Sequence, residues 1–148
     1  MKKIITLYKS ISNKISNLDF IALLAIRFIL AYGFYEPAKN KISNINSIAE
    51  WFKSMELPFP LLQAYLATYT EIVGVILLTL GFATRLISIP LMIIMLVAIK
   101  TVHWENGFAA GENGFEIPLY YLFMLLAIFT QGAGKASIDY LIKTKIKS

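Results

Sequence analysis

The chain has no cysteine, little charge and a single histidine among its 148 residues. The absence of cysteine excludes disulfides, thiolate catalysis, iron–sulfur ligation and thiolate metal sites within this chain. One histidine cannot supply both axial ligands of a haem. Charged residues make up 16% of the sequence, whereas soluble domains carry roughly 25%. These absences point away from an ordinary water-soluble domain.

Apolar residues are abundant instead, at 57% of the chain, which is more than a soluble core of this size could bury. They gather in four runs that predict membrane-spanning helices at about 18–37, 61–82, 86–104 and 115–132. The fourth run is short in its purely apolar part and needs some tolerance of mismatch at its ends. We expect a single domain over 1–148 with an all-α integral membrane fold: a four-transmembrane-helix bundle with short interfacial helices.

Lysines are concentrated at the two ends of the chain, which sets the expected orientation. The net charge is +5, with four lysines before the first apolar run and four after the last. The turn between the second and third runs adds Arg85, whereas the 103–116 connection carries no lysine or arginine. The positive-inside rule therefore predicts a multi-pass protein of the bacterial inner membrane with both termini in the cytoplasm. The basic ends indicate a lipid bilayer as partner; no nucleic acid is expected, because the sequence contains no recognition module.

Two shorter segments have the pattern of helices that lie on a membrane surface. The first, over 4–18, repeats apolar residues every three or four positions with lysines between them. The second, over 44–56, contains the capping-box spacing Ser47–Ile48–Ala49–Glu50 and is stopped by Pro58 and Pro60. Its apolar face would consist of Ile48, Trp51, Phe52 and Met55.

Two charged residues, Arg27 and Glu71, fall inside apolar runs and need a partner. A lone charge at the centre of a membrane helix costs about 2.5–3.5 kcal/mol, so such side chains face the bundle. Counted from the expected cytoplasmic ends of their spans, Arg27 lies roughly 12 Å deep and Glu71 roughly 16 Å deep. We therefore expect a buried Arg27–Glu71 ion pair, which either fixes the helix register or takes part in a proton relay.

Polar residues gather again at the outer end of the expected bundle. Lys100 and His103 are three residues apart and share one helical face at the end of the third span. The predicted outer polar ligand site consists of Lys39, Lys100, His103, Glu105 and Glu116. In one alternative, His103 binds a divalent metal together with Glu112 or Glu116, although mixed ligands on a flexible loop are a weak indication. In the other, His103 is a hydrogen-bonded packing residue.

Several motifs occur together and in order between residues 27 and 139. They are Arg27, Lys39, TEIVGVILLTLGFATR (70–85), His103 followed by NGF (106–108), NGFE (113–116) and QGAGKASID (131–139). With these motifs the chain resembles the DoxX family of small four-helix bacterial membrane proteins. The resemblance implies a four-helix membrane bundle. It implies less about activity, because relatives are linked to quinone-linked terminal oxidation, thiosulfate oxidation, oxidative-stress assemblies and modified metal-binding peptides.

Two functions agree with these observations. The first is a small inner-membrane subunit of a redox system that binds a quinone or another lipid-soluble ligand near the outer leaflet, with no covalently bound cofactor. The alternative is a non-catalytic membrane partner or anchor for an enzyme in metal or oxidative-stress handling. That anchor would dock through the outer loop and the 44–56 helix. In both cases we expect a partner protein or a homo-oligomer, and whether the chain is itself an enzyme stays open.

Overall fold

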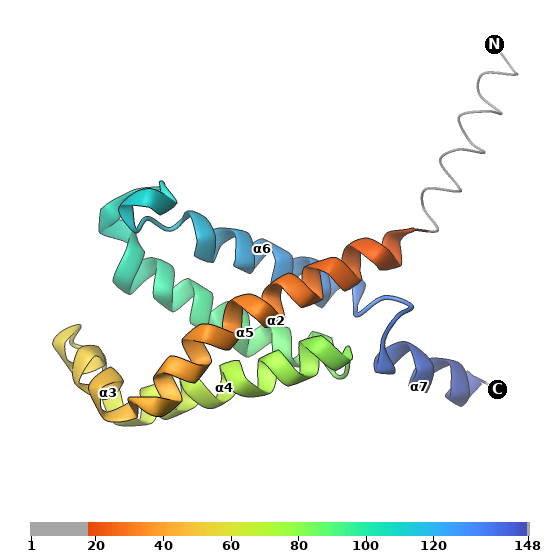
Figure 1. Ribbon diagram of the computed structural model, residues 1–148, viewed down its shortest axis with the longest axis horizontal. Coiled ribbons are helices and arrows are strands. Elements are labelled where there is room, and N and C mark those ends of the chain that lie inside the picture. Colours follow the sequence, from red (N-terminus) through yellow and green to blue (C-terminus); the bar gives the residue numbers. More distant parts are fainter. Residues whose placement is uncertain (1–17, 148) are drawn as a thin grey trace, which may run out of the picture.

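The computed structural model describes residues 18–147 and folds them into helices, with no strand in that range (Figure 1). The bundle consists of α2 (Asp19–Ser43), α4 (Pro60–Leu80), α5 (Thr84–Ala98) and α6 (Glu116–Gln131). Helices α2 and α5 each pack against both α4 and α6, so the four helices form a closed ring. The all-α fold is confirmed. The predicted surface helix over 4–18 lies outside the described residues except for its last residue.

Three helical segments are long and apolar enough to cross a membrane: Asp19–Ser43, Pro60–Leu80 and Thr84–Asn106. Helix α6 has 16 residues, and at about 1.5 Å per residue it extends only about 24 Å. The hydrocarbon core of a bilayer is roughly 30 Å thick. Three of the four predicted spans therefore have the required length, and the fourth does not.

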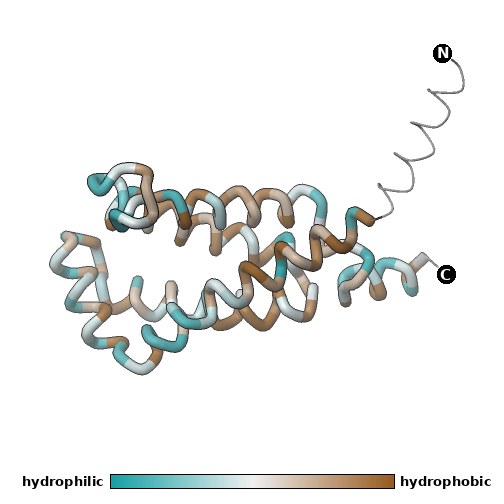
Figure 2. Tube along the Cα trace, turned by 45° about the horizontal axis from the view of Figure 1, so that its top comes forward, coloured by the Kyte–Doolittle hydropathy of each residue, from teal (hydrophilic) through white to brown (hydrophobic). Residues whose placement is uncertain are grey.

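Apolar side chains cover the outside of the bundle as well as its centre. Figure 2 shows hydrophobic residues along the length of the helices and hydrophilic residues gathered in the connections. Four outward-facing side chains are about half exposed, at 48–59%: Phe28, Leu66, Ile93 and Phe123. The centre of the core is made of fully buried residues: Leu30, Leu78, Leu91, Leu125 and Ile128. So much exposed apolar surface is unusual for a water-soluble monomer and is suited to contact with lipid.

The connections between helices divide between two ends of the bundle (Figure 1). One end, called the distal end, carries α3 (Ile45–Ser54) and the connection from α5 to α6. The other, called the tail end, carries the turn between α4 and α5, the 132–137 loop and α7 (Ile138–Lys147). The two ends hold different cavities, described below.

Helix α3 confirms the helix predicted over 44–56, but the predicted capping box is wrong. The helix begins at Ile45, two residues before Ser47, and no side chain caps its start. Asn44 is both the residue before α3 and the residue that follows α2. Because only Asn44 separates α2 from α3, the first turn of α3 is set by that short junction and not by a capping side chain.

The local sequence explains where α4 begins and ends. Pro60 occupies the first turn, where the missing N–H of proline would have no helical partner in any case. Gly81 ends the helix with φ +67°, and the Phe82 N–H donates to Leu77 O at 3.0 Å. A residue with a Cβ is strained in this left-handed conformation, so glycine suits this position.

Helix α2 continues through Pro37 to Ser43, past the predicted end of the first span at residue 37. Proline removes one helical hydrogen bond, but here it does not end the helix. The added turns bring Lys41 onto the same helical face as the buried residues Phe34 and Ala38. The extension of α2 therefore positions Lys41, which forms the ion pair described below.

Candidate functional site

A buried ion pair links α2 to α4 near the distal end. Lys41 Nζ donates to Glu71 Oε1, in the one ion pair found within residues 18–147. The Glu71 side chain is 2% exposed and the Lys41 side chain 18% exposed. The second carboxylate oxygen, Glu71 Oε2, is buried and has no hydrogen-bond partner among the described residues. The pair therefore leaves one buried acceptor available to another group.

The predicted Arg27–Glu71 ion pair is wrong. Arg27 lies at the tail end, where its Nη2 donates to Ala136 O at 2.6 Å. The depth count placed the cytoplasmic ends of the first two spans at the same level, whereas Arg27 meets Gly81, the residue that ends α4. Because α2 extends from Asp19 to Ser43, its midpoint falls near Ala31, and Lys41 is the residue of α2 that reaches Glu71.

Lys41 was not predicted to belong to the site, because it lies beyond residue 37, in a segment that was interpreted as a polar connection. A periodic pattern was nevertheless available to find it. Arg27, Phe34 and Lys41 are spaced seven residues apart, so they share one face of a continuous helix. The predicted end of the first span at about residue 37, where the apolar run stops, hid this relation.

The ion pair lines an inner cavity of about 300 Å³, to which α2, α5 and α6 contribute. His103 and Tyr121 line the same cavity. Gly33 gives Tyr121 its room, because a Cβ at Gly33 would overlap the Tyr121 hydroxyl. The cavity thus brings an ammonium, a carboxylate, an imidazole and a phenol to one space between the helices.

An apolar cleft of about 490 Å³ lies next to the inner cavity, between α3, α4 and α5. Its walls include Trp51, Phe52, Met55, Leu66, Ile93 and Val97. Four residues line both the cleft and the inner cavity: Lys41, Ile94, Ala98 and His103. Small-molecule sites are typically about 300–1,000 Å³ in volume, with apolar walls and few polar groups. The cleft has this composition, and its two basic groups, Lys41 and His103, lie where it meets the inner cavity.

His103 lies at the end of a π-helical turn, Ile99–His103, that continues α5. Its Nδ1 is 2.7 Å from Asn113 O. Since a carbonyl oxygen only accepts hydrogen bonds, Nδ1 carries the proton, and Nε2 of the neutral ring remains an acceptor. Single π-helical turns are frequent at functional sites. The contact of His103 with a ligand stays a prediction.

The other members of the predicted outer polar site do not line the cleft or the inner cavity. Three are exposed side chains near the distal end: Lys39, Lys100 and Glu105. Glu116 accepts hydrogen bonds from the Ala110 N–H at 3.0 Å and the Tyr120 hydroxyl at 2.8 Å, which tie the connection to the start of α6. The structure therefore brings His103 together with Lys41 and Glu71, and not with the other four.

The alternative metal site is not assembled among the described residues. Over residues 18–147, histidine and acidic side chains form no group of three or more that would hold a metal ion. His103 contacts Asn113, and Glu116 is engaged by Ala110 and Tyr120. Glu112 is exposed.

A second polar cluster, at the tail end, explains the motif QGAGKASID. The Asp139 carboxylate accepts from the Ala83 N–H at 2.8 Å, the Thr84 N–H at 3.1 Å and the Thr84 hydroxyl at 3.0 Å. These bonds cap the start of α5 from a distant part of the chain. The bond from Arg27 to Ala136 fixes the same loop to α2. Arg27 Nε and Nη1 are buried and have no partner among the described residues.

The fold and the cleft define a class: an all-helical membrane protein whose bundle encloses a small-molecule-sized site near one end. The DoxX family model matches residues 22–104, more than half of the chain. The chain belongs to the DoxX family.

Two relatives cover most of the chain. An uncharacterized protein of Haemophilus influenzae is 37% identical over 127 residues, which cover 83% of this chain and 84% of that protein. The inner membrane protein YphA of Escherichia coli is 29% identical over 127 residues, which cover 80% of this chain and 86% of that protein. No solved structure matches the chain.

Proposed function

We propose that the chain is a small inner-membrane subunit of a redox system that binds a quinone or another lipid-soluble ligand in the apolar cleft. The observation that carries this proposal is the cleft itself, whose apolar walls lead to the buried Lys41–Glu71 pair and His103. The inner-membrane location is supported by the apolar exterior and by similarity to YphA, which is named an inner membrane protein.

The polar groups beside the cleft match the chemistry of a quinone head group. Lys41 can donate a hydrogen bond to a quinone carbonyl, while Glu71 Oε2 and His103 Nε2 can accept from the hydroxyls of the reduced form. Conversion of a quinone to a quinol takes two electrons and two protons. The bound quinone supplies the redox chemistry, and the chain's residues orient it and exchange protons. A partner redox protein supplies the two electrons.

We further propose that the tail end faces the cytoplasm, so that the cleft opens toward the outer leaflet. Support comes from the basic residues of the tail end, which include Arg85, Lys135 and Lys143. The 103–116 connection at the distal end has neither lysine nor arginine. Retention of basic segments in the cytoplasm accounts for this asymmetry.

A fluorescence experiment tests the quinone proposal. The chain has two tryptophans, and one of them, Trp51, lines the cleft. In a Trp104→Phe background, a short-tailed quinone bound in the cleft should quench the Trp51 emission in a saturable way. Ala98 lines both the cleft and the inner cavity, so Ala98→Phe places a large side chain in the proposed site and should abolish that saturable quenching.

A second pair of variants tests whether Lys41 contributes to quinone binding. Lys41→Gln should weaken binding about tenfold or more, as expected for loss of a charged hydrogen-bond donor. Lys39→Gln removes an equal charge from an exposed position two residues away and should bind like wild type. Equal binding by wild type and Ala98→Phe would place the ligand elsewhere. Absence of saturable binding to folded wild type would remove the proposal.

The second candidate function is the non-catalytic anchor for a partner enzyme. It is favoured by an aromatic cluster on the distal connection, where Trp104 and Phe108 both pack on Phe115, with ring centroids 5.4 and 5.6 Å apart. Trp104 is 63% and Phe108 51% exposed. If the cluster docks a partner, the Trp104→Ala/Phe108→Ala variant should lose a specific co-purifying protein and keep quinone affinity. An unchanged assembly would reject this surface.

A further inference from the structure

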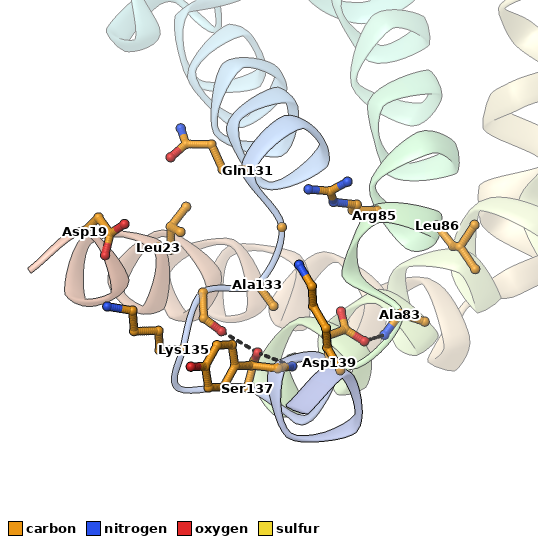
Figure 3. Close-up of a pocket in the computed structure, with 14 residues that line it drawn as sticks. Asp19, Leu23, Ala83, Arg85, Leu86, Gln131, Ala133, Lys135, Ser137 and Asp139 are labelled. Carbon is orange, nitrogen blue, oxygen red and sulfur yellow. Dashed lines mark hydrogen bonds between the residues drawn. The ribbon is translucent and has the colours of Figure 1, made fainter. Parts of the chain in front are cut away.

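The tail end holds a third cavity, of about 510 Å³, that the proposed function does not use (Figure 3). The start of α2, the beginning of α5, the loop after α6 and α7 all contribute to its lining. Three basic side chains from different segments line it: Arg85, Lys135 and Lys143. In Figure 3, Arg85 and Lys135 lie apart, with the loop that follows Gln131 between them.

None of the three cations forms an ion pair in the part of the chain that the structure describes. Lys135 and Lys143 are exposed and take part in no ion pair within residues 18–147. Arg85 is likewise unpaired there; its Nη2 donates to Thr130 O at 3.0 Å, which leaves other N–H groups of the guanidinium.

Two carboxylates also line this cavity, and both have other roles. Asp139 accepts three hydrogen bonds from Ala83 and Thr84 at the start of α5. Asp19 lies in the first turn of α2, where a negative charge is favourable because of the helix dipole. The lining therefore holds three cations against two carboxylates, an excess of one positive charge.

Arg27 adds a further positive charge directly behind the wall. A Cβ built on Gly81 would overlap Arg27 Nη1 and would lie 2.6 Å from Ser137 Cβ, so all three residues meet. Ser137 is part of the cavity lining, and Arg27 is 1% exposed. The unpartnered Nε and Nη1 of Arg27 thus contribute positive potential from beneath the surface.

We propose that the tail-end cavity binds a phosphate-bearing anion held by Arg85, Lys135 and Lys143. Basic pockets between membrane helices on the cytoplasmic side suit phosphate head groups. The Tyr140 hydroxyl and the Gln131 amide, which also line the cavity, are further hydrogen-bond donors.

The neighbouring apolar residues favour a phospholipid as the source of the phosphate. Leu86 lines the cavity and is 71% exposed, which gives the start of an acyl chain an apolar surface. Helix α7 combines three exposed apolar residues with its lysines, as surface helices on anionic membranes do: Leu141, Ile142 and Ile146. A soluble phosphate ligand would use the same cations without these apolar contacts.

Lipid binding to the full chain in neutral detergent tests the proposal. Native mass spectrometry should show tighter binding of phosphatidylglycerol than of phosphatidylcholine. The Lys135→Gln/Lys143→Gln variant should weaken phosphatidylglycerol binding about 10- to 30-fold, since each surface cation contributes substantially to anionic lipid binding. The control, Lys53→Gln/Lys100→Gln, removes two exposed lysines from the other end and should change binding less than about twofold.

Competition identifies the source of the phosphate. If inorganic phosphate leaves lipid binding unchanged, the ligand is the lipid head group. If inorganic phosphate binds and loses affinity in the Lys135→Gln/Lys143→Gln variant, the site takes a soluble phosphate. The proposal is overturned if that variant, with unchanged helicity, binds both probes as well as the control does.

Discussion

Lys41 and Glu71 depend on each other because neither charge has another ionic partner among residues 18–147. Removal of one member would leave the other charge within the bundle, which is far more costly than removal of both. Because α2 continues past Pro37, it places the Lys41 charge beside Glu71 of the neighbouring helix.

We expect Lys41→Met to lower the free energy of unfolding by about 3 kcal/mol, at the low end for broken buried pairs, because the Lys41 side chain is 18% exposed. The Lys41→Met/Glu71→Met double variant should be close to wild type in stability, as paired apolar replacements often are. Thermal unfolding in detergent of wild type, both single variants (Lys41→Met and Glu71→Met) and the double variant gives the coupling energy. Additive losses would show that the two charges do not act as a pair.

Gly81 meets two requirements at once, a left-handed backbone and contact with the Arg27 guanidinium. Gly81→Ala should cost about 1–2 kcal/mol from the backbone alone, and more because Arg27 must move. Gly111→Ala is the control for a glycine without either requirement, since its φ is not left-handed and a Cβ there meets nothing within 4 Å. Denaturation that shows equal stability for the two variants would contradict the close approach of Arg27 to Gly81.

At the scale of the elements, the start of α5 is stabilised by a residue 55 positions later in the chain. Ala83, just before α5, has a left-handed φ of 48° and no side-chain cap of its own. Asp139 supplies the missing acceptors. The cap therefore couples the α4–α5 turn to the folding of the C-terminal loop.

Asp139→Ala should destabilise the protein by about 1–2 kcal/mol, as loss of a helix N-cap does. Asp139→Asn keeps one carbonyl acceptor and should lose less. Hydrogen exchange of the amides of Ala83 and Thr84 should rise in Asp139→Ala while the amides in the middle of α4 stay protected. Unchanged exchange at Ala83 and Thr84 would show that the carboxylate does not cap α5.

Apolar runs predicted most of these elements, because long stretches without charge have one dominant solution in lipid, the helix. The second and third spans therefore agree with α4 and with the helical segment Thr84–Asn106 to within two residues. The same reasoning ended the first span at about residue 37, where the apolar run gives way to charged residues, and therefore missed Lys41. The Ser47 capping box failed because the α2–α3 junction starts the helix earlier.

The candidate site was predicted only in part, for a geometric reason. His103 was selected from its chemistry, and it does line both cavities. Which groups lie near it depends on how α2 passes α4 and how the π-helical turn directs the chain, and neither can be read from spacing along one helix. Counted along the predicted spans, Lys100 and Glu116 lie at the same depth in the membrane as His103. Neither residue lines the cleft or the inner cavity.

At the scale of the whole molecule, the open point of topology is whether α6 crosses the membrane. Its 16 residues are fewer than the roughly 20 that a span usually needs. Helix α6 nevertheless contacts α2 and α5 within the bundle. Local thinning of the bilayer can accommodate a short helix at modest cost.

The absence of cysteine makes this testable without a prior cysteine-removal step. Single Glu112→Cys and Thr144→Cys variants place a thiol on either side of α6, at exposed positions. If α6 crosses, a membrane-impermeant maleimide added to spheroplasts should label position 112 and reach position 144 only after permeabilisation. Labelling of both positions from the same side would show that α6 does not cross.

The hydrogen bond between Arg27 and Ala136 also constrains the order of biosynthesis. The two residues are 109 positions apart, so Arg27 is synthesised long before the Ala136 carbonyl to which it donates. During that interval the first segment enters the membrane while the Arg27 guanidinium still lacks this acceptor. A nascent chain stalled before residue 136 should therefore release its first segment from the bilayer more readily than the finished protein does.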